Sequence, residues 1–220
     1  LGAINVTGPF AKELLKRAGF SEPIRYMQHT QAEVAGVPCK VFRLSFTGEL
    51  SYELHHSTAH SVQLWQVLME LGKDLGVKPH GLETLTNLRL EKGHIIVGQD
   101  TDFDSTPRRI AHEWAVNLKK ERFIGRPAVV RTNKIALARQ LVGLELDGDA
   151  PFEGAVLYKG AEYAGYVTSS TYSPVLGKSV MLAWLELFDG ALPDEVTVDG
   201  RTARRVDLPF YDKEGARARA

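Results

Sequence analysis

The stretch "VPCKVFRLSFTGELSYELHH", residues 37–56, decides the fold of the N-terminal half of the chain. Apolar and polar side chains alternate along both ends of this stretch, and Gly48 lies in the turn-forming sequence between them. An alternation with a period of two is typical of half-buried β-strands, and glycine between two such runs indicates a turn. We therefore predict a hairpin-like pair of strands whose apolar face contains Phe42, Tyr52 and Leu54, with Glu53 on the opposite face.

Helical patterns surround this pair of strands. A short strand is predicted at 3–6, and a helix follows it at about 10–18 with its apolar residues on one side. After the central strands, leucines at spacings of three and four predict helices at about 59–75 and 82–92. The order strand, helix, strand, strand, helix, helix favours an α+β layer over a doubly wound sheet.

The C-terminal part changes character near residue 135, where short strands separated by glycine-containing turns begin. The Asp199-Gly200 pair predicts a tight hairpin near the end of this series. Regularly spaced short strands indicate a small antiparallel barrel. We expect two domains, a mixed α/β domain at 1–134 and a β-barrel at 135–220. The barrel strands are predicted at 141–146, 156–158, 163–169, 179–185, 196–198 and 202–206.

Composition excludes several classes of protein. Lys plus Arg and Asp plus Glu both number 27, so no excess of cations is available for nucleic acid or an anionic membrane. The single cysteine, Cys39, excludes an internal disulfide and a cysteine-based zinc site. No apolar run approaches the roughly 20 residues that span a bilayer, and the first residues do not resemble a signal peptide. We expect a soluble cytoplasmic protein.

Most groups of reactive side chains in the sequence do not form a site. His56 and His60 have helical i, i+4 spacing, but they span a strand-to-helix boundary and lack a third ligand, so we expect no metal centre. Cys39 has no partner that would make it a nucleophile. No dinucleotide-binding or P-loop glycine motif is present.

Two charged residues have a chemical interpretation beside a structural one. A carboxylate at Glu53 can accept two parallel N–H bonds from a flat amidine-like edge such as that of a pterin, although a solvated strand residue is the alternative. Arg89, at the margin of the predicted helix at 82–92, can clamp a carboxylate, and an intrahelical surface pair is its alternative. The residues alone leave both alternatives open.

A series of motifs resembles the aminomethyltransferase family, that of the glycine cleavage T-protein. Within that family the chain is most similar to the folate-binding half of the sarcosine oxidase α subunit and to dimethylglycine oxidase. The motifs occur in order over nearly the whole chain: "FTGELSYEL" (46–54), "LRLEKG" (88–93), "GQDTD" (98–102) followed by "TP" (106–107), "FIGRPA" (123–128), "GYVTSSTYSPVLGKSVMLA" (165–183) and "LPFYD" (208–212).

The resemblance implies a folate site with tetrahydrofolate as the cofactor. By this resemblance Glu53 holds the pterin ring, Arg89 binds folate, and Trp114 is an aromatic residue close to the ligand. Phe46 stands where T-proteins usually carry tyrosine, so it lacks that hydroxyl group. The catalytic aspartate of the family lies in a stretch upstream of the segment that matches this chain. No catalytic residue is assigned here, and we expect the chain to be a fragment of a longer protein.

The implied reaction is folate-dependent one-carbon (aminomethyl) transfer. Tetrahydrofolate N5 would attack the carbon of an oxidised N-methyl amine such as sarcosine and give 5,10-methylenetetrahydrofolate. The expected partners are folate, the amine-derived one-carbon donor, and a flavin domain or other subunits of an amine oxidase. Two alternatives remain: a stand-alone glycine cleavage T-protein, and a folate-binding or assembly module without catalytic activity.

Overall fold

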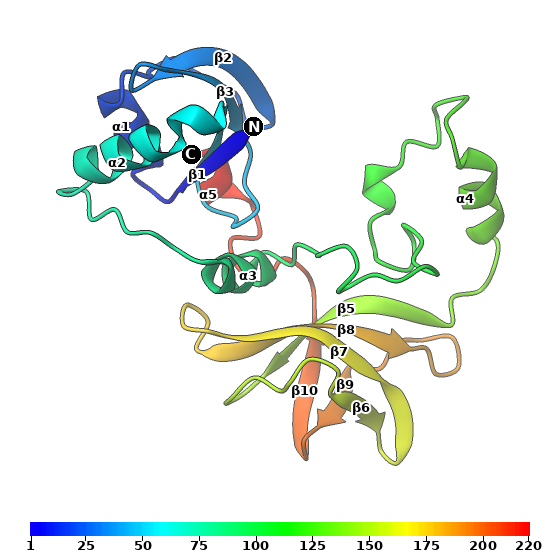
Figure 1. Cartoon of the computed structure of the whole chain (residues 1–220). Helices are drawn as coiled ribbons and strands as arrows, with labels where there is room; N and C mark the ends of the chain where they lie inside the picture. Colours follow the sequence, from blue (N-terminus) through cyan, green and yellow to red (C-terminus); the bar gives the residue numbers. More distant parts are fainter. The chain divides into compact units, whose positions relative to one another are not determined.

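The structure is a computed structural model that describes all 220 residues. The chain folds into two compact units (Figure 1). The first unit contains Leu1–Arg89 together with Asp212–Ala220, and the second contains Leu90–Tyr211. The chain therefore leaves the first unit once and returns to it at the end. The domain limits 1–134 and 135–220 stay a prediction.

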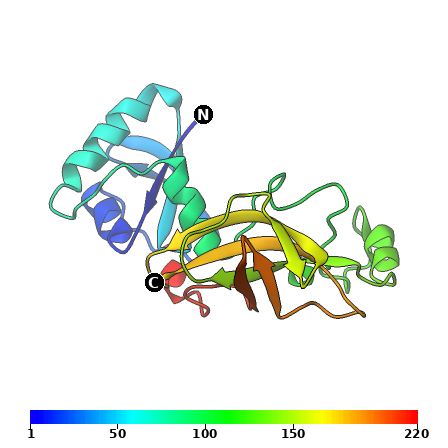
Figure 2. The same ribbon diagram turned by 90° about the horizontal axis from the view of Figure 1, so that it is seen from below.

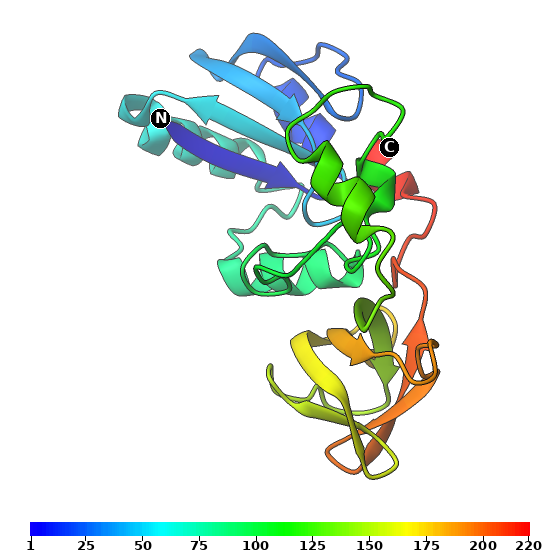
Figure 3. The same ribbon diagram turned by 90° about the vertical axis from the view of Figure 1, so that its right-hand side faces the viewer.

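The first unit is a four-stranded antiparallel sheet with two helices against one face (Figures 1 and 3). The strand order is β1-β4-β3-β2, so β1 and β2 are the edges. The helices are α1 (Ala11–Arg17) and α2 (Ser61–Leu71), and a 3-10 turn at Thr58–His60 precedes α2. The strands are β1 (Gly2–Thr7), β2 (Gln28–Val34), β3 (Val37–Arg43) and β4 (Ser51–His56).

The core of the first unit lies between the sheet and these helices. Val41 on β3 and Leu54 on β4 are paired neighbours, and both are fully buried. Leu15 from α1 and Leu64 from α2 complete the cluster from the helix side. The prediction that Phe42 shares the apolar face with Tyr52 and Leu54 is wrong. Phe42 is paired with Glu53, so it lies on the opposite face, and Val41 takes the core position.

Strand β2 was not expected from the sequence. Its residues, "QHTQAEV", are mostly polar, and only the last of them, Val34, is buried. It is an edge strand that pairs along its length with β3. The two strands are joined at Ala35 and Gly36, whose φ angles of 52° and 74° fit a tight hairpin turn with two left-handed residues.

The second unit is built around a closed six-stranded barrel in the order β10-β5-β8-β7-β6-β9 (Figure 2). All pairs are antiparallel. Asp199 and Gly200 both have positive φ, at 49° and 72°, which confirms the predicted hairpin. The strands agree with the six predicted ones to within a few residues: β5 (Arg139–Leu146), β6 (Val156–Lys159), β7 (Glu162–Ser173), β8 (Lys178–Glu186), β9 (Glu195–Val198) and β10 (Arg201–Val206).

Helices outside these two layers are short. The helix α3 (Leu82–Glu91) agrees with its prediction and spans the point where the chain leaves the first unit. The second unit also contains a 3-10 turn at Glu113–Ala115 and α4 (Arg126–Thr132), and the C-terminal segment ends in α5 (Ala216–Arg219). None of these helices is both long and apolar enough to cross a membrane. The fold class is therefore a mixed α/β domain with an antiparallel sheet, followed by an antiparallel β-barrel, as the sequence predicts.

Candidate functional site

The face of the sheet opposite its core carries a row of four side chains, one from each strand. Glu53 on β4 lies directly opposite Asn5 on β1 and Phe42 on β3. Phe42 in turn lies opposite His29 on β2. Directly opposed residues of antiparallel strands point to the same face, and neighbouring strands are about 4.8 Å apart. We call this side of the sheet the Glu53 face, defined by Asn5, His29, Phe42, Glu53 and their neighbours His55 and Ser51.

Glu53 is the chemically notable group of this face. Its side chain is 35% exposed, and its Oε2 accepts a hydrogen bond from His55 Nε2 at 3.1 Å. Oε1 makes no hydrogen bond within the chain. The His55 ring packs against Phe42 with ring centroids 4.7 Å apart. Glu53 is therefore a partly covered carboxylate, oriented by a histidine, with one oxygen and further lone pairs available to a ligand.

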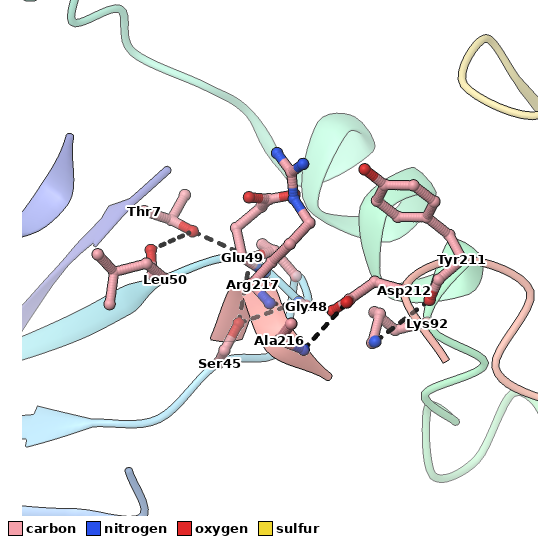
Figure 4. Close-up of polar contacts among 11 residues, drawn as sticks. Thr7, Ser45, Gly48, Glu49, Leu50, Lys92, Tyr211, Asp212, Ala216 and Arg217 are labelled. Atoms are coloured by element: carbon pink, nitrogen blue, oxygen red, sulfur yellow. Dashed lines mark hydrogen bonds and ion pairs between the residues drawn. The ribbon is translucent and has the colours of Figure 1, made fainter. Parts of the chain in front are cut away.

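The loop between β3 and β4 is held by polar contacts, which Figure 4 shows. Thr47 Oγ1 lies 2.9 Å from Thr7 Oγ1, and the Gly48 N–H donates to Ser45 Oγ at 3.0 Å. Arg217 of α5 forms an ion pair with Glu49, with Nε and Oε1 2.6 Å apart. Phe46, half-buried, lies in this loop. The loop that leads into the Glu53 strand is thus fixed at both of its ends.

Arg89 and Trp114 differ in their surroundings. Arg89, in the last turn of α3, is fully buried, so the surface ion pair proposed as its alternative is wrong. A buried guanidinium needs polar partners, because an isolated charge is costly in a protein interior. Trp114 is 81% exposed and lies against His112, with ring centroids 5.5 Å apart. The structure places Glu53, Phe46 and Arg89 in the first unit and Trp114 in the second.

A buried carboxylate of the "GQDTD" motif, Asp100, organises the second unit. Its Oδ1 accepts hydrogen bonds from Thr168 Oγ1 and Ser169 Oγ, both at 2.6 Å. Its Oδ2 accepts the Ile96 N–H at 2.7 Å, and its backbone carbonyl accepts Trp184 Nε1–H at 3.1 Å. The "GQDTD" motif and the "TSS" of β7 are therefore joined by hydrogen bonds, with the acceptors in the first and the donors in the second.

Neighbouring residues strengthen the same contact. Glu91 Oε1 accepts a hydrogen bond from Ser173 Oγ at 2.6 Å, and both residues are buried. Arg139 stacks over the Trp184 ring at 4.6 Å and pairs with Asp102 at 2.5 Å. Partial burial would raise the pKa of Asp102, but hydrogen bonds from Ser105 and Arg139 outweigh it and hold this pKa below its usual range. The sequence contains a signal for this contact. The "GQDTD" motif supplies acidic hydrogen-bond acceptors, and the "TSS" run in a separate motif supplies hydroxyl donors.

The histidines and Cys39 have structural surroundings. His56 is buried, with Nδ1 2.9 Å from the Leu54 carbonyl and Nε2 3.0 Å from Ser61 Oγ. The chain contains no group of three or more metal-ligating side chains. Cys39 is buried in the core of the first unit, and this burial raises the pKa of its thiol.

A cavity of about 550 Å³ runs along the outer edge of β1. Apolar residues from the β1–α1 connection, from α2 and from the segment after it form most of its wall, including Phe10, Trp65 and Val77. Asn5 borders this cavity as well as lying beside Glu53. The cavity therefore lies on the helix-covered side of β1, whereas the Asn5 side chain points to the Glu53 face.

Comparison with known proteins gives a consistent result. Residues 1–120 match the family model described as the GCVT N-terminal domain, and residues 139–212 match that of the glycine cleavage T-protein C-terminal barrel domain. An aminomethyltransferase of Halothermothrix orenii is 34% identical over 211 residues, covering 92% of this chain and 59% of the relative. Sarcosine oxidase subunit alpha of Corynebacterium sp. is 29% identical over 238 residues, covering 99% of this chain and 25% of the subunit.

A solved structure extends this similarity to three dimensions. The glycine cleavage system aminomethyltransferase T of Bartonella henselae matches with a TM-score of 0.81 and 26% sequence identity. The match covers 94% of this chain and 58% of that structure. The chain spans about three fifths of the length of the curated aminomethyltransferases that it matches.

Proposed function

Because the chain belongs to the glycine cleavage T-protein family, we propose that it takes part in folate-dependent aminomethyl transfer. The observation that carries the proposal is Glu53, a partly covered carboxylate on the face of an ordered sheet. A carboxylate in this setting fits the two adjacent N–H groups at the amidine edge of a pterin, since it can accept both in parallel. Tetrahydrofolate, when bound, supplies the nucleophilic nitrogen that takes up the one-carbon unit.

The chain's own residues would bind and orient this ligand. Glu53 holds the amidine edge, and the His55 hydrogen bond limits the rotation of its carboxylate. Arg89 provides a buried cation for a carboxylate or a polar group of folate. Phe46 contributes an apolar contact, without the hydroxyl that a tyrosine at this position would provide. Orientation of this kind accelerates a bimolecular transfer without covalent catalysis.

Two donors of the one-carbon unit are candidates. The named relatives with the higher identities are aminomethyltransferases, which favours the aminomethyl group of the glycine cleavage reaction. A second candidate is an oxidised N-methyl amine such as sarcosine, delivered by an associated flavin domain or subunit. The match of nearly the whole chain to a sarcosine oxidase α subunit favours this second candidate. Both donors lead to 5,10-methylenetetrahydrofolate.

The test is a titration of tetrahydrofolate under anaerobic conditions, followed by ligand-observed NMR up to millimolar concentration so that weak binding is measured. We expect Glu53→Ala to weaken binding about a hundredfold, because two hydrogen bonds to a charged group contribute about 1.5 kcal/mol each. Glu70→Ala is the matched control, since Glu70 is an exposed glutamate on α2, the helix packed on the other face of the sheet. Equal affinity of the two variants would refute the role of Glu53.

A donor assay separates the two candidates. The chain is incubated with tetrahydrofolate and either an aminomethylated lipoyl carrier protein or formaldehyde with methylamine as an iminium source. Formation of 5,10-methylenetetrahydrofolate above the uncatalysed rate with the carrier protein alone would favour glycine cleavage. Formation with the iminium source alone would favour the amine oxidase reaction, and formation with neither would leave a folate-binding module.

A further inference from the structure

We propose that Asn5 determines which heterocycles bind at Glu53, by donating an N–H to a carbonyl oxygen next to the amidine edge of the ligand. This inference rests on the proposed function and adds to it the chemical class of ring that the site accepts. Such a ring has a 2-amino-4-oxo edge, with two donors for the carboxylate and one acceptor for the amide. Glu53 reads the donors, and Asn5 reads the acceptor.

The position of Asn5 in the sheet supports this role. It is the direct cross-strand neighbour of Glu53, so the two side chains share a face and their β-carbons are about 5 Å apart. Adjacent donor and acceptor groups on a fused heterocycle have a separation of a few ångströms, which two neighbouring strands can match. Asn5 is exposed on the Glu53 face, so a ligand can reach its amide.

A second residue fixes the amide in a defined orientation. Asn5 Nδ2 donates one N–H to Ser51 Oγ at 2.9 Å, and Ser51 is almost fully buried on β4. The second N–H and the carbonyl oxygen of the Asn5 side chain make no hydrogen bond within the chain. An amide that is anchored at one N–H and open at the other presents a donor at low entropic cost. Ser51 is therefore a positioning residue for Asn5.

The remaining members of the row provide an aromatic surface of mutually tilted rings beside this polar pair. Phe42 follows Glu53 across the sheet, and its ring lies between His29 and His55, with centroid separations of 5.2 Å and 4.7 Å. Planar rings pack well against such aromatic groups. The polar end of the row, at Asn5 and Glu53, thus selects the edge of the heterocycle, while the aromatic part contacts its body.

The test compares folic acid, which has an oxo group at C4 and a hydrogen on N3, with its 4-amino analogue, which has an amino group at C4 and no hydrogen on N3. Dissociation constants for both are measured by ligand-observed NMR with the wild-type chain, Asn5→Asp and Asn5→Leu. Asn5→Asp keeps the shape and replaces the donor by an acceptor, so it should shift the ratio of the two constants at least tenfold toward the amino compound. Asn5→Leu, which keeps the shape without polar groups, should weaken folic acid about fivefold and leave the analogue unchanged.

Glu53→Ala separates a failure of this inference from a failure of the proposed function. If Glu53→Ala weakens both compounds while Asn5→Asp leaves their ratio unchanged, Asn5 is not a specificity residue and the folate site stands. If the wild-type chain binds neither compound at millimolar concentration, the proposed function fails and the role of Asn5 fails with it. A change of both constants by the same factor in Asn5→Asp would mean that Asn5 supports only the local structure, which also overturns the inference.

Discussion

Replacing Asp100 with alanine should destabilise the second unit, and the size of the effect follows from the partners of its carboxylate. Of its three described donors, Thr168 Oγ1 has a second acceptor, the Leu182 carbonyl at 3.1 Å, and keeps a hydrogen bond after the substitution. Ser169 Oγ–H and the Ile96 N–H lose theirs. A buried donor without a partner costs about 1–3 kcal/mol, so we expect a loss of about 2–4 kcal/mol.

The measurement is hydrogen exchange of the β7 and β8 amides combined with urea unfolding, because exchange reports on this unit alone. Ser169→Ala is combined with Asp100→Ala in a double-mutant cycle. In the Asp100→Ala background, removing the Ser169 hydroxyl should recover part of the lost free energy of unfolding. We expect a coupling energy between the two positions of about 1 kcal/mol or more. Ser170→Ala is the control, since Ser170 donates to the Pro151 carbonyl and should be additive with Asp100→Ala. A loss below about 1 kcal/mol, or additivity of Asp100 with Ser169, would refute the reasoning.

Two further predictions concern the second unit. Asp102→Asn should lower the free energy of unfolding by about 0.5 kcal/mol at neutral pH. Because the folded-state pKa of Asp102 is depressed, the difference in free energy between the two proteins is present above about pH 4. It disappears as the pH falls through that pKa. Thermal melts of both proteins between pH 2 and pH 7 test this, and a difference that persists at the lowest pH would contradict it. Gly165→Ala should cost about 3 kcal/mol or prevent folding, since φ is 141° and an added Cβ would lie 1.8 Å from the Trp184 carbonyl oxygen. Gly154→Ala, also at positive φ but with open space around it, should cost about 1–2 kcal/mol; equal urea midpoints for the two variants would contradict the steric argument.

The barrel was predictable because each of its strands can be recognised from a short stretch of sequence. Each strand has its own alternation or apolar run and its own turn, as at Asp199-Gly200, and closure leaves no strand at an exposed edge. Strand β2 lacks this local signal, because an edge strand exposes most of its side chains and polar residues are tolerated there. The face of Phe42 was misjudged for a related reason. Its aromatic side chain predicts a core position, whereas its pairing with Glu53 places it among histidines.

The candidate site was predictable only in part. Alternation along β4 placed Glu53 opposite Tyr52 and Leu54, and the structure agrees with that placement. The neighbours of Glu53 come from strand pairing, which a single sequence does not reveal, so Asn5 was missed. The hydrogen-bond partners of Asp100 could not be predicted, because they lie 68 and 69 residues away along the chain. Burial of Arg89 likewise depends on tertiary packing, which the pattern of one helix does not determine.

The return of the chain to the first unit has a consequence for the order of events during synthesis. The second unit is one continuous segment and can form as soon as that segment has left the ribosome. The first unit includes Asp212–Ala220, in which Arg217 pairs with Glu49 and the Ala220 carbonyl accepts a hydrogen bond from Arg43. The unit whose sheet carries Glu53 is therefore begun before the second unit and completed after it.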